Sequence, residues 1–380
     1  MSNSYFSGKF GLERETLRVD RNGRLAQTPH PFGNDENITR DFCENQTELV
    51  TPVCNSIDEA LDALARLDRR LNEQLSARGE RVWLYSNPPR FESEDEIPIA
   101  DFTGDHSSKR RYREALERKY GRRLMLFSGI HFNFSFPEEF LSVLNTAGED
   151  AQTFRSRLYL RLYKQLMCYS WLLVLLTAAS PYYDASLDKD GENGIIFSKY
   201  TSMRNSSRGY WNKFVPILDH ESLEAFTRSI GSLISSGKLY SASELYLPVR
   251  LKPRGTNTLE ALARNGVDHI ELRMFDLDPS EPLGICSNDL RFAHLLMLYL
   301  ITLPDIDFTP ELQEKAVRDH KQAALREANE ELYERAESLL NDMEKHFAGS
   351  STALSTLASA RAKLWRRRTA SSFEYINIYE

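Results

Sequence analysis

Alternating apolar and polar residues predict strands through much of the chain, and apolar residues at helical spacing predict helices between and after them. The clearest strand covers residues 124–136, where aromatic and aliphatic side chains share one face and small or polar ones the other. Its apolar positions are Ile130, Phe132, Phe134 and Phe136, and its alternate positions are Gly129, His131, Asn133 and Ser135. The same period of two predicts further strands at residues 10–19, 47–52, 244–252 and 269–275.

Local signals mark turns, helix ends and one unusual loop. Asn22 and Gly23 predict a tight turn that returns the first strand through residues 24–27. Ser56 and Glu59 form a capping-box pattern ahead of a leucine stripe that ends at Gly79. Helices are therefore expected at residues 57–78, 108–120 and 151–179, and from Ser287 onward. Residues 199–213 have the Ser, Asn, Arg and Gly content of a mobile loop that covers a substrate.

Composition favours a soluble globular protein without a nucleic-acid surface. The 380 residues are 41% hydrophobic and 27% charged, with a net charge of −7. Residues 109–111 form a basic cluster that we expect on a helix face near anionic ligands or solvent. Residues 366–368 form a second basic cluster, which we expect at a solvated helix end. Without a repeat or linker, residues 1–380 are expected to form a single catalytic domain with a helical C-terminal layer at about 287–380.

Neither a membrane nor an oxidising compartment is indicated. The apolar stretch at residues 166–179 is too short to span a bilayer, and the N-terminus lacks the apolar run of a secretory signal. The four cysteines have no zinc-like spacing, so we expect reduced thiols in the cytoplasm. No pattern indicates an oligomeric state.

The first strand carries two acids on one face. Glu13 and Glu15 are separated by one residue and therefore point to the same side of the strand. Two like charges on one face cost electrostatic energy unless a cation lies nearby. The pair therefore predicts either a divalent-metal site or a solvated edge strand.

Other strands add polar residues at positions opposite the core. They bring the total to seven positions on four strands: Glu13, Glu15, Glu48, His131, Asn133, Glu271 and Arg273. Taken alone, His131 could be a hydrogen-bonded residue inside a sheet. Likewise, Glu271 and Arg273 could be an exposed ion pair. Together, several acids on one concave surface cannot all ionise without cations.

This set of residues suits metal-bound polyphosphate. Carboxylates with one imidazole favour Mg²⁺ or Mn²⁺ over zinc, and Arg204, Lys252 and Arg273 add positive charge. The sequence contains neither a Walker motif nor a Rossmann fingerprint. We therefore expect ATP to be held through its metals.

Several motifs then occur in a family-specific order. They are residues 11–18 (GLERETLR), Asp41-Phe42 with Glu48, Tyr112-Arg113-Glu114, residues 128–135 (SGIHFNFS), Ser202-Met203-Arg204 through Gly209-Tyr210, Glu244-Leu245-Tyr246 and residues 270–273 (IELR). This set resembles bacterial glutamate-cysteine ligase over about residues 8–300. The resemblance implies an α+β fold of the glutamine-synthetase-like class, with a curved antiparallel sheet around the active site and helices packed outside. It also implies that ATP activates the γ-carboxylate of L-glutamate as an acyl phosphate, which the amine of L-cysteine then attacks.

The resemblance also assigns roles to individual residues. The implied metal ligands are Glu13, Glu15, Asp41, Glu48, His131 and Glu271. Arg273 would stabilise the transferred phosphoryl group, and Arg204 would clamp a carboxylate or that phosphoryl group. Asn133 and Lys252 would contact the nucleotide or glutamate.

The acceptor pocket is where the sequence departs from the family. Its matching residues are Phe42, Tyr112, Leu116, Tyr210 and Tyr246, but Met125 stands where the family carries a glutamine. This difference is either a neutral core substitution or a change that admits a small apolar acceptor instead of cysteine. Outside this class, the alternatives are a non-catalytic glutamate or nucleotide sensor and a glycoside hydrolase that uses paired carboxylates.

Overall fold

The computed structural model describes residues 7–102, 107–188 and 194–369. Its main sheet has seven strands, all paired antiparallel. Six follow one path in the order β2 (Ile38–Arg40), β3 (Gln46–Val50), β1 (Lys9–Val19), β5 (Ile130–Ser135), β9 (Val267–Phe275) and β8 (Val249–Pro253), and β4 (Arg81–Trp83) pairs with β1. A separate pair is formed by β6 (Tyr182–Asp184) and β7 (Ile195–Phe197).

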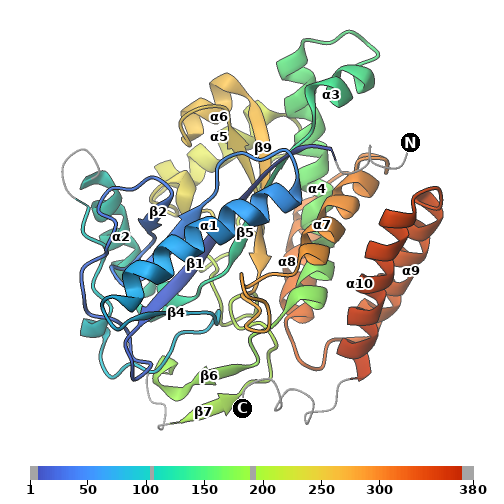
Figure 1. Ribbon diagram of the computed structural model, residues 1–380. Coiled ribbons are helices and arrows are strands. Elements are labelled where there is room, and N and C mark those ends of the chain that lie inside the picture. The colour runs from blue at the N-terminus through green and yellow to red at the C-terminus, as the bar shows by residue number, and fades with distance from the viewer. Residues whose placement is uncertain (1–6, 103–106, 189–193, 370–380) are drawn as a thin grey trace.

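Ten α-helices surround the sheet in the described part of the chain (Figure 1). They are α1 (Ile57–Ser76), α2 (Ser107–Tyr120), α3 (Glu138–Leu144), α4 (Ala151–Thr177), α5 (Leu223–Ser235), α6 (Leu259–Asn265), α7 (Ser287–Leu300), α8 (Pro310–Ala323), α9 (Glu330–His346) and α10 (Ser351–Thr369). The expected α+β class with an antiparallel sheet is confirmed. None of these helices is long and apolar enough to cross a bilayer.

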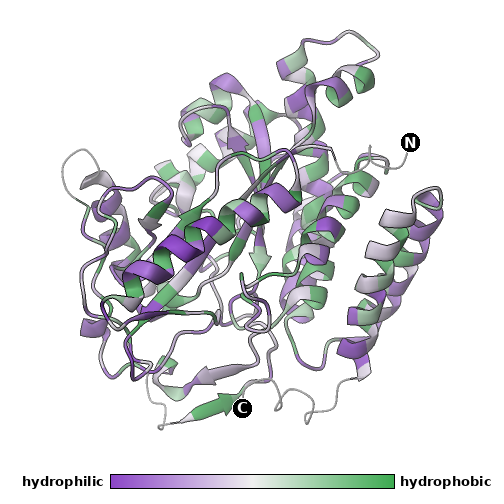
Figure 2. Ribbon diagram, viewed as in Figure 1, coloured by the Kyte–Doolittle hydropathy of each residue, from purple (hydrophilic) through white to green (hydrophobic). Residues whose placement is uncertain are grey.

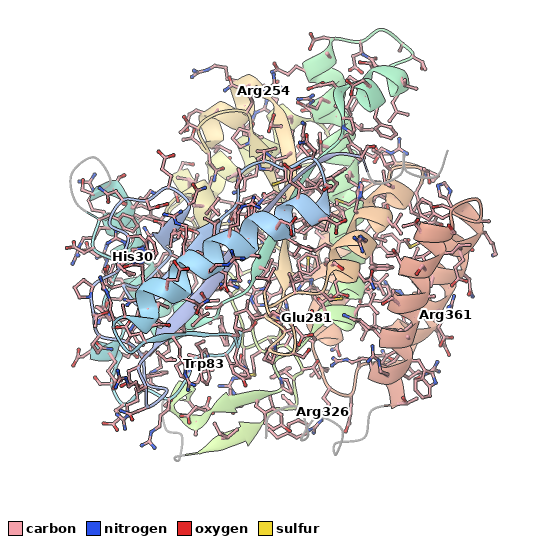
Figure 3. The ribbon with its side chains drawn as sticks, viewed as in Figure 1. His30, Trp83, Arg254, Glu281, Arg326 and Arg361 are labelled. Carbon is pink, nitrogen blue, oxygen red and sulfur yellow. The ribbon has the colours of Figure 1, made fainter. Side chains whose placement is uncertain are left out.

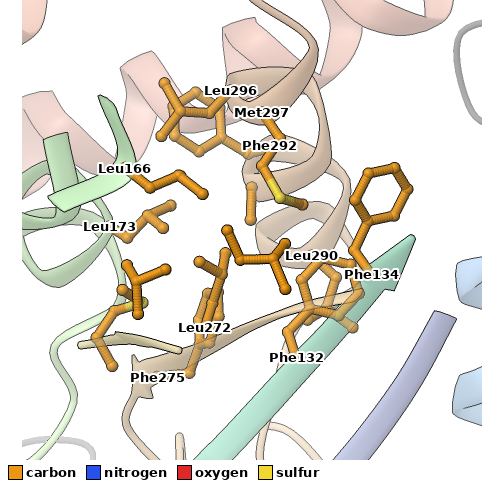
Figure 4. Close-up of a cluster of buried hydrophobic side chains, with 14 of the residues drawn as sticks. Phe132, Phe134, Leu166, Leu173, Leu272, Phe275, Leu290, Phe292, Leu296 and Met297 are labelled. Atoms are coloured by element: carbon orange, nitrogen blue, oxygen red, sulfur yellow. The ribbon is translucent and has the colours of Figure 1, made fainter. Parts of the chain in front are cut away.

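One face of the sheet is apolar and packs against helices. Phe132, Phe134 and Leu272 are fully buried there and meet side chains of α4 and α7, as Figure 4 shows. Figure 2 shows the same division, with apolar colour on the helix sides that face the sheet and polar colour outside. Because this face is filled by side chains, the acids at alternate positions of the strands point to the opposite face.

From α7 to the end of α10 the described chain is helical and adds a layer beyond α4. The helix α10 packs against α7, α9 and α4. In Figure 3, Arg361 of α10 lies on this layer, where it bonds Glu344 and Asn341 of α9. This layer lies on the helical side of the sheet, away from the acidic face.

Helix ends follow the sequence signals closely. The Ser56 hydroxyl accepts a hydrogen bond from the Glu59 amide at 3.0 Å, and Gly79 adopts a φ of 72° just after α1. The capping box is incomplete, because the Glu59 carboxylate accepts from the amide of Asn55 instead of Ser56. At the first turn, Gly23 has a φ of 75°, but the return strand is reduced to a single bridge between Val19 and Leu25.

Three predictions about local structure were wrong. Residues 124–129 do not extend β5, because residues 123–126 form a 3-10 turn before the strand. Glu244 does not lie on β8 but in another 3-10 turn, where its buried carboxylate accepts from the Tyr120 hydroxyl at 2.6 Å and pairs with Lys119. Much of the expected mobile loop is packed in the interior, with Ser202, Met203 and Ser206 fully buried, whereas Ser207 and Arg208 are exposed.

Candidate active site

The strand register gathers the predicted acids on one face. Glu15 is paired with Glu48 of β3, Glu13 with His131 of β5, and Asn133 with Glu271 of β9. Paired residues in antiparallel strands point to the same face of the sheet. Side chains remote in sequence therefore meet in one place.

These residues open into one cavity of about 270 Å³. Its walls include all six predicted metal ligands, both predicted catalytic arginines, Lys252 and six predicted acceptor-pocket residues. Further residues that line it are Lys109, Arg113, Phe127, Ser243, Arg250 and Asn257. The sequence prediction and the cavity thus agree at all positions except Asn133.

Glu13, His131 and Glu271 form the tightest group. One ligand atom from each lies within 4.8 Å of the others. The His131 Nδ1 atom lies 3.0 Å from Glu13 Oε2 and 3.3 Å from Glu271 Oε1. Two carboxylates and an imidazole at this spacing could hold a divalent cation.

The other side of the His131 ring faces a second group of acids. Its Nε2 atom lies 3.5 Å from Glu15 Oε1, yet it is buried and makes no hydrogen bond to the described residues. Glu48 and Asp41 complete this group. A buried ring nitrogen left beside carboxylates fits metal coordination, because buried polar atoms are otherwise almost always paired.

Electrostatics distinguish the two groups. Burial and the charge of Asp41 raise the pKa of Glu15 to about 8 and also hold the pKa of Glu48 well above its ordinary value. For Glu13, burial and Glu271 act to raise the pKa, but the hydrogen bond with His131 and the charge of Lys252 outweigh them and hold it near 2. A cation beside Glu15 and Glu48 would therefore displace protons, because it stabilises their ionised forms.

Glu271 is surrounded by cations. Its Oε1 lies 2.7 Å from Nη1 of Arg273, and its Oε2 lies 3.2 Å from Nζ of Lys252 and 3.9 Å from Nε of Arg250. Burial acts to raise the pKa of this fully enclosed carboxyl, but these charges hold it well below its ordinary value. The three cations around this single carboxylate could also bind phosphate oxygens.

A buried loop positions Arg204. Its Nη1 donates to the carbonyl oxygens of Arg273 at 2.9 Å and Phe275 at 2.8 Å. The preceding Ser202 hydroxyl donates to buried Asp276 at 2.8 Å, which anchors the loop to the end of β9. The guanidinium lies directly over Gly129, where a Cβ atom would overlap it.

Part of the cavity wall is apolar and aromatic. Phe42, Leu116, Met125 and Tyr246 are buried in one hydrophobic cluster, against which Tyr112 and Tyr210 pack. The rings of Tyr210 and Tyr246 lie 4.1 Å apart at their centroids. Met125 is 1% exposed and belongs to the 3-10 turn at residues 123–126.

Asn133 lies behind the site. Its amide donates to Glu13 Oε1 at 3.0 Å, and it does not belong to the lining of the cavity. In this structure it orients Glu13. Its predicted contact with the nucleotide or glutamate stays a prediction.

Sequence reasoning missed several cavity residues although their spacing contained a signal. Lys109 and Arg113 lie at i and i+4 of α2, on the helix face that also carries the predicted residues Tyr112 and Leu116 at i+3 and i+7. Arg250 is two residues from Lys252 and shares its side of β8. Both patterns could have been read as cavity-facing, but polar residues at such spacing usually face solvent.

Comparisons with known proteins agree with this geometry. A family model described as glutamate-cysteine ligase matches residues 2–241 and 234–323. The glutathione biosynthesis bifunctional protein of Listeria innocua is 40% identical over 336 residues, covering 84% of this chain and 43% of that protein. The glutamate–cysteine ligase of Clostridium acetobutylicum is 30% identical over 382 residues, covering 86% of this chain and 78% of that protein.

Solved structures share the fold over nearly the whole chain. A bifunctional glutathione synthetase from Pasteurella multocida has a TM-score of 0.85 and 26% identity, covering 99% of this chain and 50% of its own. A glutamate–cysteine ligase from Francisella tularensis in complex with AMP has a TM-score of 0.86 and 23% identity, covering 100% of this chain and 85% of its own. The chain spans 43% of the length of the bifunctional relatives from Listeria innocua and Listeria monocytogenes. The family match and these relatives establish that the chain belongs to the glutamate-cysteine ligase family.

Proposed function

We propose that the protein is an ATP-dependent ligase that joins the γ-carboxylate of L-glutamate to the amine of L-cysteine. The products are γ-glutamylcysteine, ADP and phosphate. The observation that carries the proposal is the single cavity in which six candidate metal ligands, two arginines and an apolar pocket meet. Family membership supports the same reaction, and we propose that residues 1–380 act as one catalytic domain.

The reaction has two steps. A γ-carboxylate oxygen of glutamate attacks the γ-phosphorus of ATP, which forms γ-glutamyl phosphate and releases ADP. The neutral amine of the acceptor then attacks the acyl carbon, phosphate leaves, and the nitrogen loses one proton. The cavity contains candidates for both steps, because acids and cations line it together with an aromatic and apolar wall.

The acids would hold Mg²⁺, with Mn²⁺ as an alternative. Glu13, His131 and Glu271 would hold one ion, and Glu15, Asp41 and Glu48 another. When bound, such ions would neutralise negative charge on the phosphates. The raised pKa of Glu15 and the Nε2 atom of His131, which faces Glu15 and makes no hydrogen bond to the described residues, support an ion at the second of these groups.

The arginines and Lys252 would act on the phosphates directly. Arg273 lies 2.7 Å from Glu271 and can exchange that partner for the transferred phosphoryl group. Arg204 is fixed by two carbonyl groups and presents its remaining N–H groups to the cavity, where it would clamp a carboxylate or phosphoryl oxygen. Because ATP is the co-substrate, we place the reaction in the cytoplasm.

The acceptor is the least determined substrate. The wall around Met125 is formed by apolar and aromatic side chains, so a small apolar amino acid is the second candidate acceptor. A hydrophobic pocket discriminates weakly between groups of similar size. This observation supports a γ-glutamyl ligase with an acceptor other than cysteine as the alternative.

The test uses the purified chain with ATP, MgCl₂, glutamate and a panel of amino acids, with products identified by mass spectrometry. The proposal predicts ADP release that requires glutamate and metal and is highest with cysteine. If cysteine fails while an apolar analogue yields a γ-glutamyl product, the alternative acceptor is correct. If no amino acid yields product but glutamate or nucleotide binds, the chain is a sensor, and full turnover by Glu271→Gln would show that the site is misplaced.

A further inference from the structure

One buried arginine ties the C-terminal helix α10 to the middle of the chain. The sequence predicts a solvated helix end at residues 366–368, but the side chain of Arg367 is only 9% exposed. Its Nη2 atom donates to the Thr201 hydroxyl, to the Leu325 carbonyl at 3.0 Å and to the Ala323 carbonyl at 3.3 Å. Its Nε and Nη1 atoms make no hydrogen bond to the described residues, so these three bonds alone hold the buried charge.

The groups that Arg367 contacts lie at the end of α8. This helix ends at Ala323, and a cation beside its last carbonyl groups also compensates the negative end of the helix dipole. The carbonyl of Ala324, between the two that Arg367 contacts, accepts from the Thr201 amide at 2.8 Å and from the Thr201 hydroxyl at 3.2 Å. Thr201 is therefore bonded to the end of α8 and to α10 at the same place.

Thr201 begins the segment that carries Arg204 into the cavity. It stands three residues before Arg204, whose side chain lines the site. The segment between them has little freedom, because the Ser180 amide donates to the Thr201 carbonyl at 2.7 Å and the Ser202 hydroxyl donates to Asp276 at 2.8 Å. Closely packed segments transmit a displacement instead of absorbing it, so a shift at Thr201 would reach Arg204.

We propose that Arg367 is a positioning residue that holds Arg204 in place through Thr201. The inference rests on the proposed function, because it acts through the role given there to Arg204. Arg367 does not line the active-site cavity, and the family match ends at residue 323, before α9 and α10 begin. The helix α10 would thus belong to the catalytic unit although it touches no substrate.

The experiment compares Arg367→Met with wild type and with Arg366→Met, measured as glutamate-dependent ADP release at saturating ATP, MgCl₂ and cysteine. Arg366 is an exposed neighbour on α10, so its replacement is a matched control. For Arg367→Met kcat should fall about 10-fold or more, because a displacement of less than 1 Å at Arg204 is enough, whereas Arg366→Met should stay within about 2-fold of wild type. Arg367→Lys, which keeps a charged donor, should restore most of the loss.

A second variant tests the same contact from its other side. Thr201→Val removes the hydroxyl that Arg367 contacts but keeps the volume of the side chain, so it decides the question if Arg367→Met fails to fold. Its kcat should also fall, and the loss should not add to that of Arg367→Met.

Combination with Arg204→Ala separates positioning from general stabilisation. If Arg367 acts through Arg204, adding Arg367→Met to Arg204→Ala should cause little further loss of kcat. A lower thermal unfolding midpoint with kcat unchanged in Arg367→Met and Thr201→Val, or an equal additional loss in the Arg204→Ala background, would overturn the role of Arg367 but leave the ligase activity standing. If wild type releases no ADP with glutamate and any acceptor, the proposed function itself fails, and the role of Arg367 with it.

Discussion

Gly129→Ala should impair catalysis through Arg204 without disturbing the fold. A Cβ atom at position 129 would lie 2.6 Å from Nη2 of Arg204 and closer still to Cζ and Nη1. Ordinary contacts of this kind begin near 3.4 Å, so the guanidinium must retreat by about 1 Å. It would then lose the hydrogen bonds to the carbonyl groups of Arg273 and Phe275 that fix it. Misplacement of about 1 Å can cost about 100-fold in rate.

The assay for this variant measures kcat for glutamate-dependent ADP release, together with the thermal unfolding midpoint. We expect kcat to fall about 100-fold, while overpacking costs no more than about 1–3 kcal/mol of stability, because the displaced group is the end of a flexible side chain. Gly231→Ala is the control, since the nearest atom to its Cβ would be 4.0 Å away, within α5.

A double-mutant cycle identifies the route of the effect. If Gly129→Ala acts through Arg204, adding it to Arg204→Ala should cause little further loss. Full activity in the single variant, or an equal additional loss in the Arg204→Ala background, would refute the reasoning. The first result would mean that Arg204 does not work in the observed position, and the second that Gly129 acts by another route.

Three further predictions concern metal, pH and the acceptor. Glu271→Gln should weaken Mn²⁺ binding at least about 10-fold, as measured by calorimetry. The control is Glu224→Gln, on an exposed turn of α5, which should leave the affinity unchanged. Equal Mn²⁺ affinities of the two variants would show that Glu271 is not a metal ligand. Burial, with a smaller contribution from Lys321, lowers the pKa of His320 to about 3 in the folded protein. Below about pH 6.5 the unfolded chain therefore binds a proton at this residue that the folded protein does not, so the free energy of unfolding falls as the pH drops toward 3. Between pH 6.5 and 5 this one group should cost about 2 kcal/mol in urea unfolding, and His320→Asn should flatten that dependence; an unchanged slope would contradict it. Met125→Gln should lower kcat/KM for apolar acceptors relative to cysteine, and an unaltered ratio would mean that Met125 is a neutral core substitution.

The polar faces of the strands could be predicted from the sequence because a period of two is a local property. Glu13 and Glu15 must share a side of β1 whatever surrounds them, and His131 must oppose Phe132. The register of the sheet then places the polar faces of neighbouring strands side by side. Five of the six expected ligands therefore face one cavity from the strands, while Asp41, which only the family resemblance indicated, lines it from the turn between β2 and β3.

Features that depend on distant partners could not be predicted in the same way. Glu244 continues an alternating pattern, but its carboxylate bonds Tyr120 and Lys119 of α2, which pulls it out of β8. The loop around Ser202 has the composition of a mobile segment, yet Asp276 anchors it in the interior. Lys109 is exposed on α2, and only the cavity beside that helix shows that it also lines the site.

The cations gathered on Glu271 have a consequence for ionic strength. A site made of bare positive charges attracts anions at long range and weakens steeply as salt is added. Here Arg273, Lys252 and Arg250 already share a buried carboxylate, so an arriving phosphate exchanges partners instead of neutralising open charge. Nucleotide affinity should therefore depend on geometry more than on salt, and the protein can fold without an anion to hold these three side chains together.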